Sequence, residues 1–184
     1  MKATFIASGA AALGLASAAS ADVTFTFTNQ TWTGFNFSDL NSVFGGFTGT
    51  LTGVSVNATL NASGGFAYAD DLTIYVDPLP LGTGGLLQVG GFNNLSALQR
   101  LSWASGGSSA PGTTVVDTKS VNPIAFDGSI PGLTIWLGNG YGASGSSGTW
   151  TGSITLIGVN AVPAPGALAL LGLAGLAGRR RRGA

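Results

Sequence analysis

The residues of this chain that could do chemistry belong to a narrow set of types. Its 184 residues include no His, no Cys and no Glu, so the seven acidic side chains are all Asp. Without His and Cys, the common catalytic triads, thiol nucleophiles and the usual zinc sites are excluded. Paired-carboxylate chemistry would rest on Asp alone. The composition therefore predicts that the chain is not an enzyme, with Asp-based catalysis as a minor alternative.

Two adjacent carboxylates, Asp70 and Asp71, form the one acidic pair in the sequence. Neighbours on a strand point to opposite faces, so these two side chains can meet only in a turn. Calcium prefers oxygen ligands, which Asp70, Asp71 and Asp77, with Asp127 farther along, could supply together with backbone carbonyls. Asp is also a common turn residue, and the chain has no EF-hand loop. A turn role is favoured, and calcium is the alternative cofactor.

Stacking against sugar rings is a further chemistry that the sequence allows. Aromatic rings with Asn, Ser and Thr nearby are what a carbohydrate-binding surface needs. The candidates are Trp32, Trp103, Trp136, Trp150, Tyr68, Tyr75 and Tyr141. Trp136 and Trp150 lie in apolar runs, which favours positions in the core. Trp103 and Tyr141 are flanked by Ser and Gly, so we expect these two rings to be exposed.

The elements that must position these residues are predicted to be short β-strands. In residues 23–28, Val23, Phe25 and Phe27 alternate with threonines, a period typical of a half-buried strand. Similar patterns predict strands at residues 47–60, 72–76, 86–89, 113–117, 133–137 and 150–159. Gly53 interrupts one of these runs and predicts a β-bulge. Residues 94–101 fit either a short helix or a loop packed by its leucines.

Gly-rich turns separate these predicted strands. We expect residues 22–161 to form one domain. Many short strands at this spacing indicate an all-β fold, an antiparallel β-sandwich or jelly roll. We also expect helix at the two ends of the chain: an N-terminal signal helix and a short C-terminal apolar helix.

The net charge of zero conceals an uneven distribution of charge. Residues 1–21 carry a charge of +1 from Lys2. Residues 22–161 carry a charge of −5, because they contain seven Asp and only two basic residues, Arg100 and Lys119. The remaining residues carry +4 from four arginines. Phosphate contacts need Lys and Arg, so the acidic domain indicates that no nucleic acid is a partner.

The N-terminal residues have the pattern of a signal peptide. Lys2 precedes a short apolar run, and Ala19-Ser20-Ala21 follows it. A positive start, an apolar middle and small residues at −3 and −1 predict a signal peptide over residues 1–21. Ala19 and Ala21 then direct signal peptidase to cut before Asp22, after export by the general machinery. A membrane anchor is disfavoured because the run is short and rich in Ala and Gly.

Residues 162–184 form a tail of three parts. Prolines open it, a wholly apolar stretch at residues 167–178 follows, and basic residues come next. The apolar stretch is short for a permanent span, so it predicts a temporary inner-membrane anchor whose arginines stay on the cytoplasmic side. The residues assigned to sorting and processing are Val162, Pro163, Ala164, Pro165, Gly166, Arg179, Arg180, Arg181 and Arg182.

This tail resembles the PEP-CTERM sorting domain of exported proteins from Gram-negative bacteria that make extracellular polysaccharide. In that family a Pro-Glu-Pro signature precedes the apolar helix and the basic cluster, whereas here Ala164 stands between Pro163 and Pro165. The resemblance implies recognition by exosortase, a membrane transpeptidase that processes the tail near the signature. The mature domain would then reside at the cell surface or in the extracellular matrix, where extracellular polysaccharide is a potential partner.

The middle of the chain is similar to the P domain, a jelly-roll module attached to many exported proteins. The similarity lies in the strand at Asp71-Leu72-Thr73-Ile74, the Asp77-Pro78 turn after it, and a late Gly148-Thr149-Trp150 strand. It implies a jelly-roll fold and no activity of its own.

We therefore expect an exported, C-terminally sorted cell-surface or matrix protein with a non-catalytic structural or adhesive β-domain. The alternative is a carbohydrate- or calcium-binding module.

Overall fold

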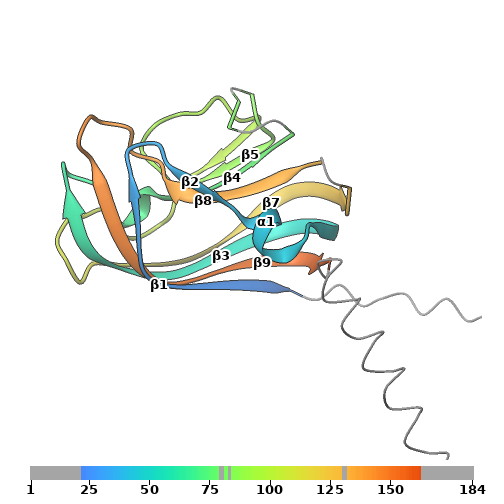
Figure 1. Ribbon diagram of the computed structural model, residues 1–184, viewed down its shortest axis with the longest axis horizontal. Coiled ribbons are helices and arrows are strands. Elements are labelled where there is room, and N and C mark those ends of the chain that lie inside the picture. The colour runs from blue at the N-terminus through green and yellow to red at the C-terminus, as the bar shows by residue number, and fades with distance from the viewer. Residues whose placement is uncertain (1–21, 79–80, 83, 130–131, 163–184) are drawn as a thin grey trace, which may run out of the picture.

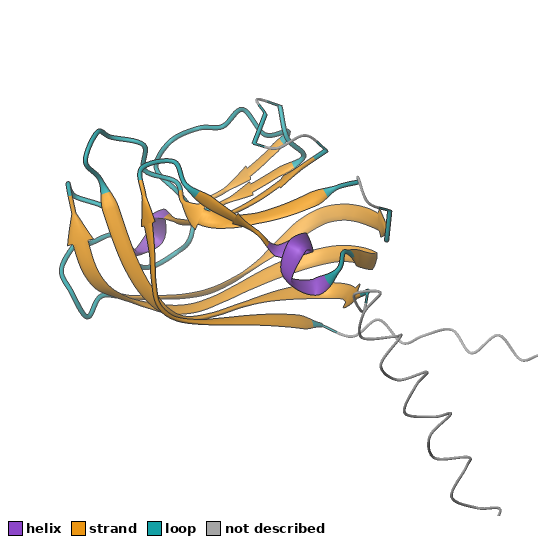
Figure 2. Cartoon of the chain, in the orientation of Figure 1, coloured by secondary structure: helices purple, strands orange, loops and turns teal. Residues whose placement is uncertain are grey.

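The part of the chain that the structure describes folds into two β-sheets with very little helix (Figures 1 and 2). The computed structural model describes residues 22–78, 81–82, 84–129 and 132–162. The predicted signal helix at residues 1–21 and the tail from Pro163 to Ala184 lie outside the described residues. Within the described part, no helix is both long enough and apolar enough to cross a membrane.

The first sheet has four strands and the second has five. The first follows the order β1 (Val23–Thr33), β9 (Ser147–Ala161), β3 (Phe47–Gly64) and β7 (Thr114–Asp127). The second follows β2 (Phe37–Asp39), β8 (Thr134–Asn139), β4 (Leu72–Asp77), β5 (Leu87–Val89) and β6 (Gln99–Leu101). All neighbours pair antiparallel except β5 and β6, which are parallel. Among the described residues, the helical segments are α1 (Leu40–Phe44) and the 3-10 turn η1 (Ala69–Asp71).

The alternation of apolar residues and threonines in β1 gives one buried and one exposed face, as predicted. Val23 and Phe27 are buried and Phe25 is half-buried, while Thr24 and Thr26 are exposed. Buried side chains from both sheets form one apolar cluster, to which the four-stranded sheet contributes Leu51, Val54 and Ile154 and the five-stranded sheet Leu72, Ile74 and Leu137. Burying each such side chain contributes about 1.5–3 kcal/mol, so this shared core holds the two sheets together.

A β-bulge lies where Gly53 predicted it. The register of β3 with β7 shifts between Leu51 and Gly53, and that of β3 with β9 shifts between Gly49 and Gly53. The predicted strands are present, but several are longer than predicted. In particular, β7 continues to Asp127 as an edge strand, a position that tolerates Pro123. The three-residue strands β2 and β6 and the helix α1 were not predicted.

The loops on both sides of β5 cover Tyr75 on the outer face of the five-stranded sheet. The hydroxyl of Tyr75 donates to Gly82 O at 2.8 Å and accepts from Gly85 N at 2.9 Å. Tyr75 is fully buried, so its assignment to a sugar-binding surface is wrong. The helical alternative at residues 94–101 is also wrong, because Ser96 N bonds Asn94 Oδ1 and Ser96 has a left-handed φ of 58°. The segment is a loop that leads into β6.

The antiparallel pairing gathers several strand ends at one end of the domain. The start of β4 lies beside the end of β8, and the ends of β5 and β6 lie at the same end of the sheet. The end of β3 and the start of β9 pair there in the other sheet. At the opposite end, Ala161 pairs with Phe47. Figure 2 shows the two short helices at these opposite ends, η1 at the first and α1 at the second.

Candidate functional site: an aromatic cleft

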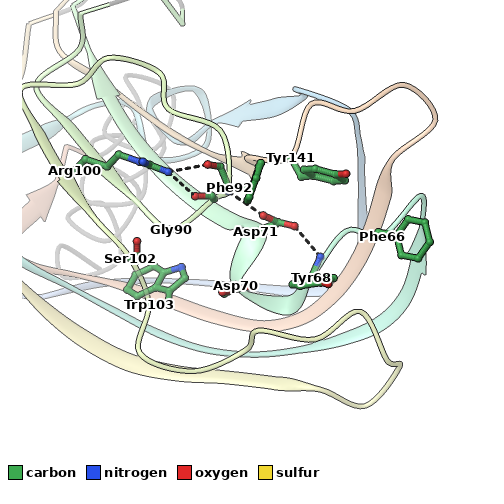
Figure 3. Close-up of a pocket in the computed structure, with 11 residues that line it drawn as sticks. Phe66, Tyr68, Asp70, Asp71, Gly90, Phe92, Arg100, Ser102, Trp103 and Tyr141 are labelled. Atoms are coloured by element: carbon green, nitrogen blue, oxygen red, sulfur yellow. Dashed lines mark hydrogen bonds between the residues drawn. The ribbon is translucent and has the colours of Figure 1, made fainter.

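An open cleft of about 510 Å³ lies where the ends of β4, β5, β6 and β8 meet (Figure 3). Its lining comes from η1, from the loops that follow β3, β5 and β8, and from β6 and the segment after it. The lining residues are Phe66, Tyr68, Asp70, Asp71, Gly90, Gly91, Phe92, Arg100, Ser102, Trp103 and Tyr141.

The carboxylate of Asp71 ties two parts of the cleft together. Asp71 is buried; its Oδ2 accepts from Tyr68 N at 2.7 Å and its Oδ1 accepts from Phe92 N at 2.9 Å. Burial raises the pKa of Asp71 to about 6. The hydrogen bonds from the Tyr68 and Phe92 amides lower this pKa, and the charge of Asp70 raises it further. One buried carboxylate thus sets the positions of two backbone segments that carry aromatic rings.

Trp103 forms the floor of the cleft and depends on a glycine. Its side chain is only 5% exposed, and its Nε1 donates to Leu72 O at 2.7 Å. The expectation that Trp103 is exposed is therefore wrong, because the indole needs a buried carbonyl partner. Gly90 has a φ of 81°, and a Cβ there would collide with the Trp103 Nε1 and Leu72 O atoms. Only glycine combines this conformation with this close approach.

Two rings, Phe92 and Tyr141, form one wall of the cleft. Their centroids are 5.7 Å apart and their planes meet at 86°, an edge-to-face contact. The Tyr141 backbone N–H donates to Oδ1 of the buried Asn139 at 3.1 Å. Phe92 is 73% exposed, whereas Tyr141 is half-buried and so less exposed than predicted. An apolar ring so open to water does little for the stability of the domain.

Phe66 and Tyr68 form the opposite rim. Phe66 is 76% exposed and adopts a left-handed φ of 65°, a conformation that bulky residues rarely adopt. Such strain tends to occur at functional sites. Sequence reasoning missed both Phe66 and Phe92, although each follows a Gly-Gly pair. That signal is ambiguous, because Phe47 also follows Gly-Gly and is buried in the core.

Asp70 and Arg100 add charge to the lining. Asp70 is half-buried, and desolvation by burial raises the pKa of its carboxyl, partly offset by its own backbone N–H. The guanidinium of Arg100 donates from Nη2 to Phe92 O at 2.8 Å and to Gly91 O at 3.3 Å. The arginine therefore supports the backbone beneath the Phe92 ring.

The structure separates the predicted metal ligands. Asp70 and Asp71 lie together in η1, in the turn that their meeting requires. Asp77 lies at the far end of β4, a six-residue strand about 20 Å long. Asp127 ends β7, where its Oδ1 accepts from Ser129 N at 2.9 Å. Within the described ranges, no group of three or more acidic, His or Cys side chains is placed to hold a metal ion.

The remaining predicted residues lie elsewhere. Trp32 and Trp150 are buried in the core, as expected for Trp150, while Trp136 is only half-buried. Among the sorting residues, Val162 is described, and its N–H donates to Gly46 O at 3.0 Å. The other sorting residues and the cleavage residues Ala19 and Ala21 lie outside the described residues.

Comparison of the chain with protein-family models, with curated proteins and with solved structures finds no match. The chemistry of the cleft itself therefore carries the functional inference. It presents apolar ring faces, a half-exposed carboxylate and a guanidinium within one open depression. This combination suits a ligand that has both apolar faces and hydroxyl groups.

Proposed function

We propose that the chain is an exported, C-terminally sorted cell-surface or extracellular-matrix protein whose β-domain is a non-catalytic adhesive module that binds carbohydrate in the aromatic cleft. The observation that carries this proposal is the gathering of Phe66, Tyr68, Phe92 and Tyr141 around one open depression beside Asp70. These rings come from three separate loops, so their proximity is a property of the fold.

A sugar ring fits this lining for a simple physical reason. One face of a pyranose carries C–H groups, which gain from covering an aromatic ring, and its rim carries hydroxyls, which need acceptors and donors. The exposed rings offer the first kind of contact, and Asp70 and Ser102 offer the second. A volume of about 510 Å³ is also within the usual range of about 300–1,000 Å³ for ligand sites.

The export part of the proposal rests on the residues at the two ends. The signal pattern at residues 1–21 and the tail at residues 162–184 are placed as a sorted surface protein needs them. The last strand, β9, ends at Ala161, next to the start of the proposed tail. An exosortase-type transpeptidase would process the tail near Pro163 and Pro165 during a transient contact with the inner membrane.

We also propose that the two sheets form a jelly-roll sandwich. In chain order the first strand pairs with the last, β2 pairs with β8, β3 pairs with β7, and β4 pairs with β5. A chain folded back on itself in this nested way and rolled into two sheets is a jelly roll. The shared core between the sheets supports the same arrangement.

A glycan array followed by isothermal titration tests the binding proposal. We expect the purified protein to bind one class of oligosaccharide, and Phe92→Ala or Tyr141→Ala to weaken binding roughly tenfold through the lost ring contact. Leu98→Ala is the matched control, because Leu98 is 82% exposed and lies outside the cleft. Equal binding by the wild type and Phe92→Ala contradicts the proposed site.

Mass spectrometry of the mature protein from its native host tests the export proposal. We expect a new N-terminus at Asp22 and a C-terminus near the proline motif. A chain that is intact through Ala184 contradicts the sorting proposal.

A further inference from the structure

We infer that the carbohydrate preferred by the cleft bears free amino groups, as an oligomer of 2-amino-2-deoxyhexose does, and that Asp70 receives an ammonium group of this ligand. This inference rests on the proposed carbohydrate binding and adds the chemical class of the ligand.

The charged groups that line the cleft leave a net negative charge. They are Asp70, Asp71 and Arg100. The Asp71 oxygens already accept two backbone N–H groups, and the Arg100 guanidinium already donates to two carbonyls of the neighbouring loop. Asp70 is half-buried and lines the cleft, so it is the acidic group that a ligand there can reach. A cationic ligand group gains most from this arrangement.

The charge of the whole domain acts in the same direction. Residues 22–161 contain seven Asp but only two basic residues, Arg100 and Lys119. Lys119 lies on β7, where its Nζ atom is 2.9 Å from Asp117 Oδ2. The surrounding field is therefore negative, which repels sugars that carry carboxylates or sulfates and attracts sugars that carry ammonium groups.

The aromatic rings favour the same ligand. The amino group of an aminohexose is a ring substituent, so a ring that stacks in the cleft brings its ammonium close to the aromatic lining. An ammonium within about 6 Å of an aromatic ring face gains cation–π attraction. Tyr68 and Trp103 line the cleft together with Asp70, so attraction by a carboxylate and by ring faces can act on one group.

Three oligosaccharides of equal length test the inference by titration into the full chain near neutral pH and low salt. They are a glucosamine oligomer, an N-acetylglucosamine oligomer and a uronate oligomer, which keep the ring and change its charge. We expect the glucosamine oligomer to bind roughly three- to tenfold more tightly than its acetylated form, and the uronate most weakly. Added salt should narrow the difference.

Two Asp→Asn variants locate the effect. Asp70→Asn should remove the preference for the free amine, so that the variant binds the glucosamine and acetylated oligomers with about equal affinity. Asp127→Asn changes the net charge equally but lies at the end of β7, outside the cleft, so it should keep the preference. A preference retained in Asp70→Asn overturns the assignment of the ammonium to Asp70.

The outcomes separate this inference from the proposal beneath it. Tight binding of the acetylated or uronate oligomer, with no advantage for the amine, overturns the inference and leaves carbohydrate binding intact. Binding of none of the three, together with a glycan array without a response, overturns both. The wild-type comparison of the three ligands stands without any variant, so a folding defect in Asp70→Asn would not remove the test.

Discussion

Two exposed regions of this domain are built from opposite kinds of residue: the cleft and the outer face of the four-stranded sheet. On the outer face, hydroxyls on neighbouring strands bond one another, with Thr24 and Thr155 oxygens 2.9 Å apart and Thr31 and Thr149 oxygens 2.7 Å apart. In the cleft, aromatic rings stand open to water around a half-buried carboxylate. The threonine side chains of the outer face thus hydrogen-bond one another, whereas the exposed rings of the cleft leave apolar surface in contact with water.

The difference separates what the fold needs from what a ligand needs. Threonine favours strands, and its hydroxyl finds partners across the sheet, so the outer face is explained by the sheet itself. The exposure of Phe66 and Phe92, the left-handed φ of Phe66 and the buried charge of Asp71 do not stabilise the domain. The proposed carbohydrate binding gives the exposed rings a role that the stability of the domain does not.

The largest expected effect comes from the floor of the cleft. Gly90→Ala places a Cβ against Trp103 and the Leu72 carbonyl, whereas Gly84→Ala adds one in open space at a similar φ. Both variants lose about 1 kcal/mol from the left-handed backbone, and Gly90→Ala loses about 1–3 kcal/mol more by overpacking. Urea unfolding measures the pair. Equal losses of unfolding free energy in the two variants would show that Trp103 and the Leu72 carbonyl shift to accommodate the added Cβ without cost.

The next effect is a dependence of stability on pH. The pKa of Asp71 is about 6 in the folded protein, against the ordinary value of 3.8 expected in the unfolded chain. The folded state therefore binds the proton of this carboxyl more tightly than the unfolded state does. The free energy of unfolding should therefore fall by roughly 2–3 kcal/mol as pH rises from about 4 to above 6. Asp70, whose pKa is also raised, acts in the same direction.

Asp71→Asn tests the origin of this dependence. The variant should flatten the curve of unfolding free energy against pH, because its side chain does not titrate. Asp127→Asn is the control: its pKa is lowered by the hydroxyl and N–H of Ser129, so it acts in the opposite direction and only in acid. An unchanged curve in Asp71→Asn would contradict the assignment to the buried carboxylate.

The smallest effect is expected on the outer face. Thr155→Val removes one hydroxyl partner of Thr24 and keeps the strand-favouring shape, so the loss should stay within about 0.5 kcal/mol. Binding of the oligosaccharide should not change. Loss of binding in Thr155→Val would move the ligand site to the hydroxyl face and reverse the comparison of the two regions.

Much of the sheet structure could be predicted from local patterns. The alternation of Val23 and Phe27 with threonines predicts the buried face of β1, and Gly53 predicts the bulge in β3. Strands of three residues, such as β2 and β6, are too short to show a period. They form because β8 and β5 offer them partners, which no local pattern contains.

The cleft was harder to predict because long-range contacts build it. The turn at Asp70 and Asp71 could be foreseen from neighbouring residues, and so could part of the exposure of Tyr141. The Ser and Gly residues near Trp103 led to the wrong prediction that its ring is exposed. Small flanking residues indicate a loop backbone, but they do not show that the indole N–H bonds to the distant Leu72 carbonyl. The hydrogen bond from Phe92 N to Asp71 joins segments 21 residues apart, a distance at which sequence patterns carry no signal.

The strand β9 begins at the cleft end and finishes at Ala161, and it lies between β1 and β3 along its length. A pull applied at Val162 acts along this strand, so it loads the hydrogen bonds on both sides of β9 in parallel rather than one after another. A ligand held at the opposite end would place the domain under tension along its long axis. In the proposed function, this strand order lets the domain transmit mechanical force between a tether beyond Val162 and a polymer bound in the cleft.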